Sequence, residues 1–165
     1  MRYSRGFTLV ELMVVLAILA IGAAVAVPSY NSFMTRNRIA AVSNEFVSVL
    51  SFARMEAIKR GYRVGVRASA ATANNEWGGG LVVWADINND GIQNAGEEVL
   101  RNMQGSNETT LDSQAGITFL AFDSRGFANS NDVIRLCAST ASSGGVDIEL
   151  LRSGRVRVSQ GANCS

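Results

Sequence analysis

The spacing of hydrophobic positions changes twice along the chain and divides it into three stretches. Residues 7–27 are apolar or small except for Thr8 and Glu11. Beyond them, apolar residues between positions 39 and 57 recur at steps of three and four, which predicts an amphipathic helix. After Gly61 the period becomes two, which is typical of half-buried strands. The pattern therefore predicts one long helix followed by a strand-rich part.

The first stretch is long enough to cross a membrane. Its helical residues, at about 1.5 Å each, extend over roughly 31 Å, the thickness of the hydrocarbon core of a bilayer. Arg2 and Arg5 precede it, and short basic flanks stay in the cytoplasm. We therefore expect residues 7–28 to form a single transmembrane helix, with the C-terminal part of the chain on the extracytoplasmic side.

The helix is predicted to continue beyond the membrane through residues 29–61. Pro28 is the only proline and removes one backbone hydrogen bond, so we expect a kink there, with Gly22 as a second weak point. Lys59 and Arg60 before a glycine are typical of a helix C-terminus. One stripe of this amphipathic half should face a core, and it consists of Ile39, Val42, Phe46, Val49, Leu50, Ala53 and Ala57.

Residues 62–165 are predicted to form a globular head made of strands. Because all connections between the strands look local, we expect antiparallel sheets and an α+β fold in which the long helix packs on an antiparallel β-sheet head. The segments with a period of two are residues 62–67, 81–85, 98–102, 117–122, 133–138, 146–151 and 155–159. The last two flank Arg152-Ser153-Gly154, so we expect them to form a closing hairpin.

Composition argues against several classes of function. The chain has 15 Lys and Arg, 14 Asp and Glu, and no histidine. A net charge so close to zero argues against bulk electrostatic capture of nucleic acid as the main task. The lack of histidine removes the usual general base and the commonest metal ligand, and no serine lies in a G-x-S-x-G sequence. We expect neither an enzyme nor a bound metal or cofactor.

The charges are unevenly distributed along the chain. Seven Lys and Arg face only two acids between residues 36 and 67, whereas residues 68–134 hold nine acids and two arginines. Opposite patches could help neighbouring subunits to set their register. The simpler alternative is an ordinary solvated surface.

Cys137 and Cys164 are the only cysteines, and both belong to the part expected outside the cytoplasm. Oxidising conditions there favour a disulfide between them, which would close a loop and contribute roughly 3 kcal/mol of stability. The alternative is a pair of free thiols. Two cysteines so far apart in sequence give little support for a metal or redox site.

Two further segments have patterns that suggest ligands. The segment from Asp86 to Glu97 satisfies the spacing of an EF-hand calcium loop, but its flanks have the pattern of strands, and an Asx-rich hairpin would satisfy its own backbone in the same way. Arg152, Arg155 and Arg157 gather near the C-terminus. Since Glu149 is close and no aromatic residue is interleaved for base stacking, we do not predict nucleic acid as a partner. Whether the first segment binds calcium is left open.

The N-terminal string Gly6-Phe7-Thr8-Leu9-Val10-Glu11-Leu12 resembles the processing site of type IV prepilins. The resemblance implies that residues 1–6 are a leader peptide, that prepilin peptidase cuts between Gly6 and Phe7, and that Phe7 is then N-methylated. It also implies that Glu11 pairs with the N-terminal amine of a neighbouring subunit during assembly. The alternative is ordinary signal peptidase, for which Ala24-Val25-Ala26 would be a site and would leave a soluble protein starting at Val27.

The head resembles the GspH/FimT group of minor pilins and type II secretion pseudopilins. This resemblance implies a minor pilin that initiates type IV pilus assembly, with other minor pilins, the major pilin, prepilin peptidase and an inner-membrane assembly platform as partners. The alternatives are a type II secretion pseudopilin or a competence-type DNA-binding minor pilin. The motifs that support the resemblance are Ser51 to Ala57, the Trp84-Ala85-Asp86 to Gly96-Glu97 hairpin, Phe122 to Gly126 and Ser153 to Val156.

Overall fold

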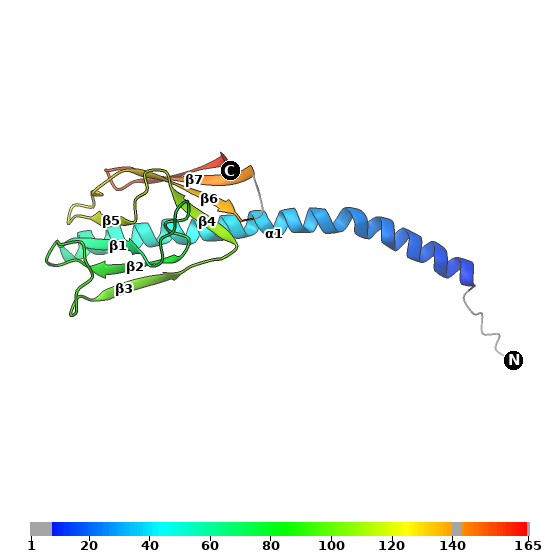
Figure 1. Ribbon diagram of the computed structural model, residues 1–165, viewed down its shortest axis with the longest axis horizontal. Helices are drawn as coiled ribbons and strands as arrows, with labels where there is room; N and C mark the ends of the chain where they lie inside the picture. Colours follow the sequence, from blue (N-terminus) through cyan, green and yellow to red (C-terminus); the bar gives the residue numbers. More distant parts are fainter. Residues whose placement is uncertain (1–7, 140–142, 165) are drawn as a thin grey trace. The chain divides into compact units, whose positions relative to one another are not determined.

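The computed structural model describes residues 8–139 and 143–164 and contains one long helix and two four-stranded antiparallel sheets (Figure 1). The predicted α+β class is confirmed. The helix is α1 (Leu9–Arg60). The first sheet has the order β3-β2-β1-β5 and consists of β1 (Val64–Ala68), β2 (Gly80–Ala85), β3 (Val99–Gln104) and β5 (Phe119–Phe122). The second has the order β4-β6-β7-β8 and consists of β4 (Thr109–Ser113), β6 (Asp132–Ala138), β7 (Ser143–Leu150) and β8 (Val156–Asn163).

The chain divides into two compact units, with the boundary between Asn37 and Arg38 inside α1. We call residues 38–165 the head unit, so the second half of the helix belongs to it. Helix α1 ends at Arg60, as predicted: Gly61 has a φ of 74° and its N–H donates to the carbonyl of Ala57 at 3.0 Å. A positive φ at the residue after the helix favours glycine.

The first unit contains the part of α1 that precedes Asn37. The helix continues without interruption through Gly22 and Pro28, so the kink expected at these two residues stays a prediction. The Ser32 hydroxyl donates to the carbonyl of Pro28 at 3.1 Å. Serine hydroxyls inside helices often donate in this way to the backbone carbonyl four residues earlier.

The core of the head unit is formed by one stripe of α1 and the inner faces of both sheets. Six of the seven predicted stripe residues are buried, and Val42 is half-buried. Phe46, for example, has no exposed surface and packs edge-on against Trp77, with ring centroids 5.9 Å apart. Strands of both sheets contribute Val64, Val66, Leu120, Ile134, Leu136 and Ile148 to the same cluster. The periodicity of the sequence thus identified the buried face of the helix.

The strand pairings are antiparallel, as predicted, but the expectation that all connections are local is wrong. Strand β5 returns to pair with β1, with Val64 opposite Phe122, although three strands separate them in sequence. Strand β4 lies in the other sheet, where Thr109 faces Ala138 of β6. Strand β4 was not predicted, because Leu111 is its single large apolar residue and its polar residues resemble those of a loop. Strand β8 is also longer than predicted and ends at Asn163.

Candidate assembly site

The part of α1 that belongs to the first unit, residues 9–37, which we call the first half of α1, exposes many large apolar side chains. Their exposed fractions range from 42% at Met34 to 74% at Leu9. By length and composition this part of the helix can cross a membrane. An exposed apolar surface of this extent favours lipid or other protein chains over water. The residues are Leu9, Val10, Leu12, Met13, Val14, Val15, Leu16, Ile18, Leu19, Ile21, Val27, Tyr30, Phe33 and Met34.

Glu11 and Thr8 form a reciprocal cap at the start of α1. The carboxylate oxygen Oε2 of Glu11 accepts from the N–H and the hydroxyl of Thr8, at 3.0 and 3.1 Å, and the N–H of Glu11 donates to the Thr8 hydroxyl at 3.2 Å. This is the capping box, in which a Thr at the N-cap and a Glu three residues later satisfy each other's backbone N–H groups. The pattern T-x-x-E is the sequence signal for this cap, which was not among the predictions. Gly6 and Phe7, the predicted processing residues, lie outside the described residues.

Three of the motifs that resemble the minor pilins meet at Arg54. Its Nε donates to the carbonyl of Gly126 at 3.0 Å, and its Nη2 donates to the carbonyl of Ser153 at 3.1 Å. The turns on either side are tight: a Cβ added at Gly154, where φ is 74°, would lie 2.1 Å from the carbonyl oxygen of Gly126. The helix motif therefore holds together the turn after β5 and the turn between β7 and β8.

The structure joins Cys137 of β6 to Cys164, which follows β8, in a disulfide with a Cα–Cα distance of 5.8 Å. Gly145 of β7 lies beside it: a Cβ there would come within 2.5 Å of the Cys164 sulfur and 2.9 Å of the Cys137 sulfur. The bond fastens the C-terminal end of the chain to β6. Because the disulfide leaves no space for a Cβ at Gly145, β7 needs a glycine at this position.

The carboxylates of the segment from Asp86 to Glu97 are engaged within the chain. Buried Asp86 accepts from the N–H of Gly91 and lies 3.1 Å from Nε of Arg63, whose Nη1 donates to the carbonyl of Asn89 at 3.0 Å. Glu97 accepts two backbone N–H bonds, at 3.1 and 2.9 Å. In a turn of this kind, the Asp, Asn and Glu side chains satisfy the backbone N–H groups of the same segment. Within residues 8–139 and 143–164, no three His, Cys, Asp or Glu residues are grouped as metal ligands.

Asp90 is exposed, and several groups of the same segment donate hydrogen bonds to its carboxylate. Its carboxylate accepts from the N–H of Ile92 at 2.7 Å and from the side-chain amides of Asn88 and Asn94. The bond from the Ile92 N–H, followed by that from Asn94, lowers the pKa of the Asp90 carboxyl. The loop thus stabilises its own negative charge by hydrogen bonds.

Much of the uneven charge seen along the sequence is balanced inside the head unit. Arg38 lies 2.9 Å from Glu108, Arg60 contacts both Glu56 and Glu98, and Arg63 contacts the buried Asp86. The basic stretch and the acidic stretch are therefore partners within one chain, which leaves less charge for the proposed contacts between subunits. Near the C-terminus, Arg157 faces Glu149 across β7 and β8, at 3.9 Å, while Arg152 and Arg155 are exposed.

Comparison with known families gives two matches. Residues 42–159 match the model of the type II transport protein GspH, and residues 1–27 match the model of the prokaryotic N-terminal methylation motif. Over 64 residues the chain is 41% identical to a fimbrial protein of Pseudomonas aeruginosa, covering 39% of this chain and 41% of that protein. It is 46% identical to the type IV major fimbrial protein FimA of Dichelobacter nodosus over 41 residues, covering 25% of this chain and 26% of that protein. The matched part thus spans less than half the length of these relatives.

Two solved structures have the same fold. The type IV minor pilin FimU of Pseudomonas aeruginosa aligns with a TM-score of 0.63 at 20% identity and covers 81% of this chain and 99% of that one. The minor pseudopilin EpsH from the type 2 secretion system of Vibrio cholerae aligns with a TM-score of 0.52 at 16% identity and covers 73% and 94%. Both likenesses extend over most of this chain, so the pilin-like fold predicted from the sequence is confirmed.

Proposed function

Since the chain belongs to the GspH family of type II transport proteins, we propose that it is a minor type IV pilin that joins a pilus initiation or tip complex and promotes pilus assembly. Pilins and pseudopilins are structural subunits rather than enzymes. The observation that carries the proposal is the division of α1: its first half exposes apolar side chains, while its second half is packed into a head with its own core. Such a subunit can be held by its helix and present its head.

The N-terminal segment is proposed to be processed before assembly. Prepilin peptidase removes the leader, residues 1–6, by cutting between Gly6 and Phe7, and Phe7 becomes N-methylated. Residues 7–28 then form the transmembrane and assembly helix, residues 29–61 the amphipathic half, and residues 62–165 the β-rich part. Since Arg2 and Arg5 keep the leader in the cytoplasm, the head faces the periplasm until the subunit enters the pilus.

Glu11 is proposed to change partners on assembly. In the single chain its carboxylate is bonded to Thr8. In a bundle of pilin helices the same carboxylate would face the N-terminal amine of a neighbouring Phe7, and the two charges would compensate each other in a low-dielectric environment. The other minor pilins, the major pilin and the inner-membrane assembly platform are the proposed partners. The mechanism is one of positioning, with no chemical step after processing.

A role as a type II secretion pseudopilin is the second candidate. The GspH family model and the likeness to the pseudopilin EpsH favour it. The competence-type DNA-binding alternative has less support, because Arg157 already faces Glu149. Deleting the gene separates the two leading functions: loss of surface pili supports the minor pilin, and loss of exported enzymes with normal pili supports the pseudopilin.

The first test is N-terminal mass spectrometry of the mature protein purified from membranes. We expect the chain to begin at a methylated Phe7. A mature start at Val27 would indicate ordinary signal peptidase and a free domain, and both the assembly helix and the proposed pairing of Glu11 would then be wrong.

A further inference from the structure

Three large apolar side chains are exposed on the head unit near the C-terminal end of α1. Met55 and Ile58 lie on this helix outside its buried stripe, and they are 62% and 50% exposed. Because residues three apart on a helix are neighbours, these two side chains are adjacent. Phe127, in the turn after β5, is also 50% exposed. We call these three residues the apolar patch.

The turn that carries Phe127 lies against α1. A Cβ added at Gly126 would lie 2.7 Å from Cδ1 of Ile58, and Nε of Arg54 donates to the carbonyl of Gly126 at 3.0 Å. The turn is closed by Asp123, whose Oδ1 accepts from the N–H of Phe127 at 2.8 Å. Helix and turn therefore form one preformed surface, which loses little conformational freedom when it binds a partner.

Four basic side chains lie around the apolar patch: one on α1, one in the turn after β5 and two in the turn between β7 and β8. The guanidinium of Arg125 lies 5.4 Å from the centre of the Phe127 ring. The turn between β7 and β8 pairs with the residue that follows Phe127, because the carbonyl of Arg152 accepts from the N–H of Ala128 at 2.9 Å. We call these four residues the basic rim: Lys59, Arg125, Arg152 and Arg155.

The basic rim carries more positive charge than the acids beside it balance. Two of its members have an acidic neighbour: Lys59 lies 3.7 Å from Glu56, and Arg125 lies 3.1 Å from Asp123. The two arginines between β7 and β8 take part in none of the ion pairs of residues 8–139 and 143–164. An apolar surface edged by excess positive charge is complementary to a protein segment whose apolar side chains are flanked by carboxylates.

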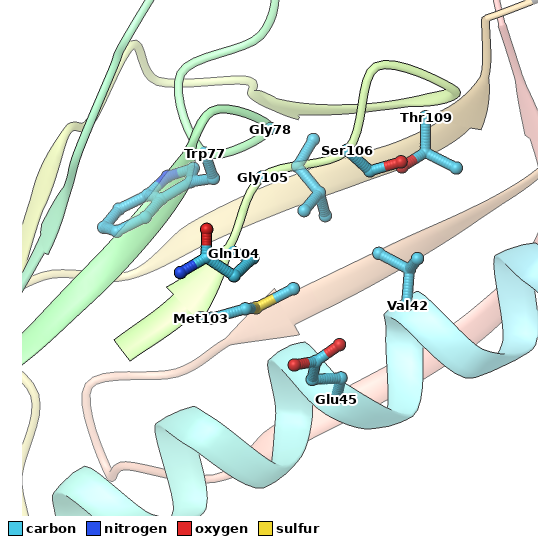
Figure 2. Close-up of a pocket in the computed structure, with 10 residues that line it drawn as sticks. Val42, Glu45, Trp77, Gly78, Met103, Gln104, Gly105, Ser106 and Thr109 are labelled. Atoms are coloured by element: carbon cyan, nitrogen blue, oxygen red, sulfur yellow. The ribbon is translucent and has the colours of Figure 1, made fainter. Parts of the chain in front are cut away.

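The acids of this chain are poor partners for the basic rim, because almost all of them are engaged within the chain. Within residues 8–139 and 143–164, every Asp and Glu except Glu45 accepts a hydrogen bond or forms an ion pair. Figure 2 shows Glu45 on α1, at a pocket that Val42 and Met103 also line. One such carboxylate does not match a rim of four basic residues, so the complementary acids belong to a different protein.

We propose that the apolar patch and the basic rim form the docking surface for an acidic segment of a different pilin subunit. The segment packs its apolar side chains on the patch and directs its carboxylates at Arg152 and Arg155. This inference rests on the proposed function, which places other pilin subunits next to this chain. It goes further because it assigns one named surface to a partner of stated chemistry.

Two other kinds of partner fit this surface less well. A nucleic acid would need rings on which its bases can stack, and two of the three residues of the patch, Met55 and Ile58, are aliphatic. An anionic membrane surface would take up apolar side chains that insert into it. Ile58 and Phe127 are each half covered by the head, so they form a flat contact surface that favours another protein.

The test is site-specific photocrosslinking of the full-length chain in cells that assemble pili. The photoreactive and apolar p-benzoylphenylalanine replaces Met55, and ultraviolet light joins it to whatever lies on the patch. We expect a covalent complex with a different pilin subunit, and mass spectrometry should place the link in a peptide that contains Asp or Glu. The same probe at Ile92, which is 55% exposed and lies between β2 and β3, is the matched control.

Charge reversal separates docking through the basic rim from mere proximity. Arg152→Glu with Arg155→Glu should lower the yield from the probe at Met55 about tenfold or more, because the carboxylates of the partner would then face like charges. Products from the probe at Ile92 should not depend on these two arginines. Lysine in place of the partner's crosslinked acids should restore the yield, which it could not do for a variant that had simply failed to fold.

The inference would be overturned by a product with a second copy of this chain, with lipid or with nucleic acid. The absence of a product from the probe at Met55, or a yield that the double variant leaves unchanged, would overturn it as well. A chain that starts at methylated Phe7 and enters pili without this product would overturn the inference alone. A start at Val27 would instead overturn the proposed function.

Discussion

The two halves of α1 share one continuous backbone and differ in what covers their apolar side chains. Phe33, in the first half, is 54% exposed, whereas Phe46, in the second, has no exposed surface. Between residues 9 and 27 of the first half, every position except Glu11 is apolar or small, so apolar residues cover all sides of the helix. In the second half they recur at steps of three and four, so they form one stripe that the sheets bury. Hydrophobicity without periodicity thus marks a segment that needs lipid or other helices, and periodicity marks one with its own core.

The charged residues of the two halves differ in the same way. Within residues 8–139 and 143–164, the Glu11 carboxylate accepts its hydrogen bonds from Thr8, in its own turn of the helix. Arg54, by contrast, reaches two turns that are far away in sequence. Changes in the first half should therefore affect assembly and leave the head stable, while changes in the second half should affect the stability of the head first.

The largest expected effect is that of Glu11→Ala on assembly. If Glu11 pairs with the N-terminal amine of a neighbour in the helix bundle, removing the carboxylate leaves a buried amine without its partner. Breaking such a pair costs about 3–5 kcal/mol, which is more than a hundredfold in occupancy. Immunoblots of sheared pili should show almost no variant, while denaturant unfolding followed by Trp fluorescence should be unchanged.

Thr8→Ala is the control that separates capping from pairing, because it removes the cap and leaves the carboxylate. It should reduce incorporation far less than Glu11→Ala, since an N-cap contributes about 1 kcal/mol. Normal pilus numbers in the Glu11→Ala strain would mean that the carboxylate serves only as a cap. The proposal that the first half of α1 acts in assembly through Glu11 would then be wrong.

The next effect compares one residue type in the two halves. Phe46→Ala should destabilise the head by about 3–5 kcal/mol, because it removes a buried ring that packs against Trp77. Phe33→Ala should change the unfolding free energy by less than about 0.5 kcal/mol. Denaturant unfolding of the full chain in detergent, followed by Trp fluorescence, measures both. Equal losses from the two variants would mean that the first half of α1 supports the fold of the head.

Local patterns in the sequence were sufficient for the helix and its buried stripe. Each of these features depends on residues that are close in sequence, such as Lys59 and Arg60 before Gly61 at the helix end. The Thr8–Glu11 cap also has a local signal, the pattern T-x-x-E, although the long apolar run that follows it dominates this stretch.

Non-local features could not be predicted in this way. Strand β4 is stabilised by its pairing with β6, and its own residues give only Leu111 as an apolar signal. The pairing of β1 with β5 joins segments whose registers are set by the sheet as a whole. A pocket lined by Val42, Glu45 and Trp77 exists only because α1, the loop between β1 and β2 and the start of β4 converge. The residues that converge are far apart in sequence, so no local pattern predicts their contact. The same is true of the hydrogen bonds from Arg54 to Gly126 and Ser153.

Loss of the disulfide should have the third largest effect and should be confined to the head. Replacing both Cys137 and Cys164 by Ser removes a cross-link between residues separated by 27 positions, which is worth about 3 kcal/mol in the chain-entropy model. Denaturant unfolding should show this loss, and dithiothreitol should reproduce it in the parent chain and have no effect on the double variant. A parent chain whose stability does not respond to dithiothreitol would contradict the prediction.

The smallest effect again uses a matched pair, one arginine from each half of α1. Arg54→Met keeps the aliphatic stem but removes the bonds to the carbonyls of Gly126 and Ser153. Hydrogen bonds from a charged group contribute about 1.5–3 kcal/mol each in favourable cases, and since part of Arg54 is exposed we expect a total loss of about 2 kcal/mol. Arg36→Met lies on an exposed part of the first unit and should cost less than about 0.5 kcal/mol. An Arg54→Met chain with unchanged stability would show that the two turns keep their positions through their own backbone bonds, without the helix.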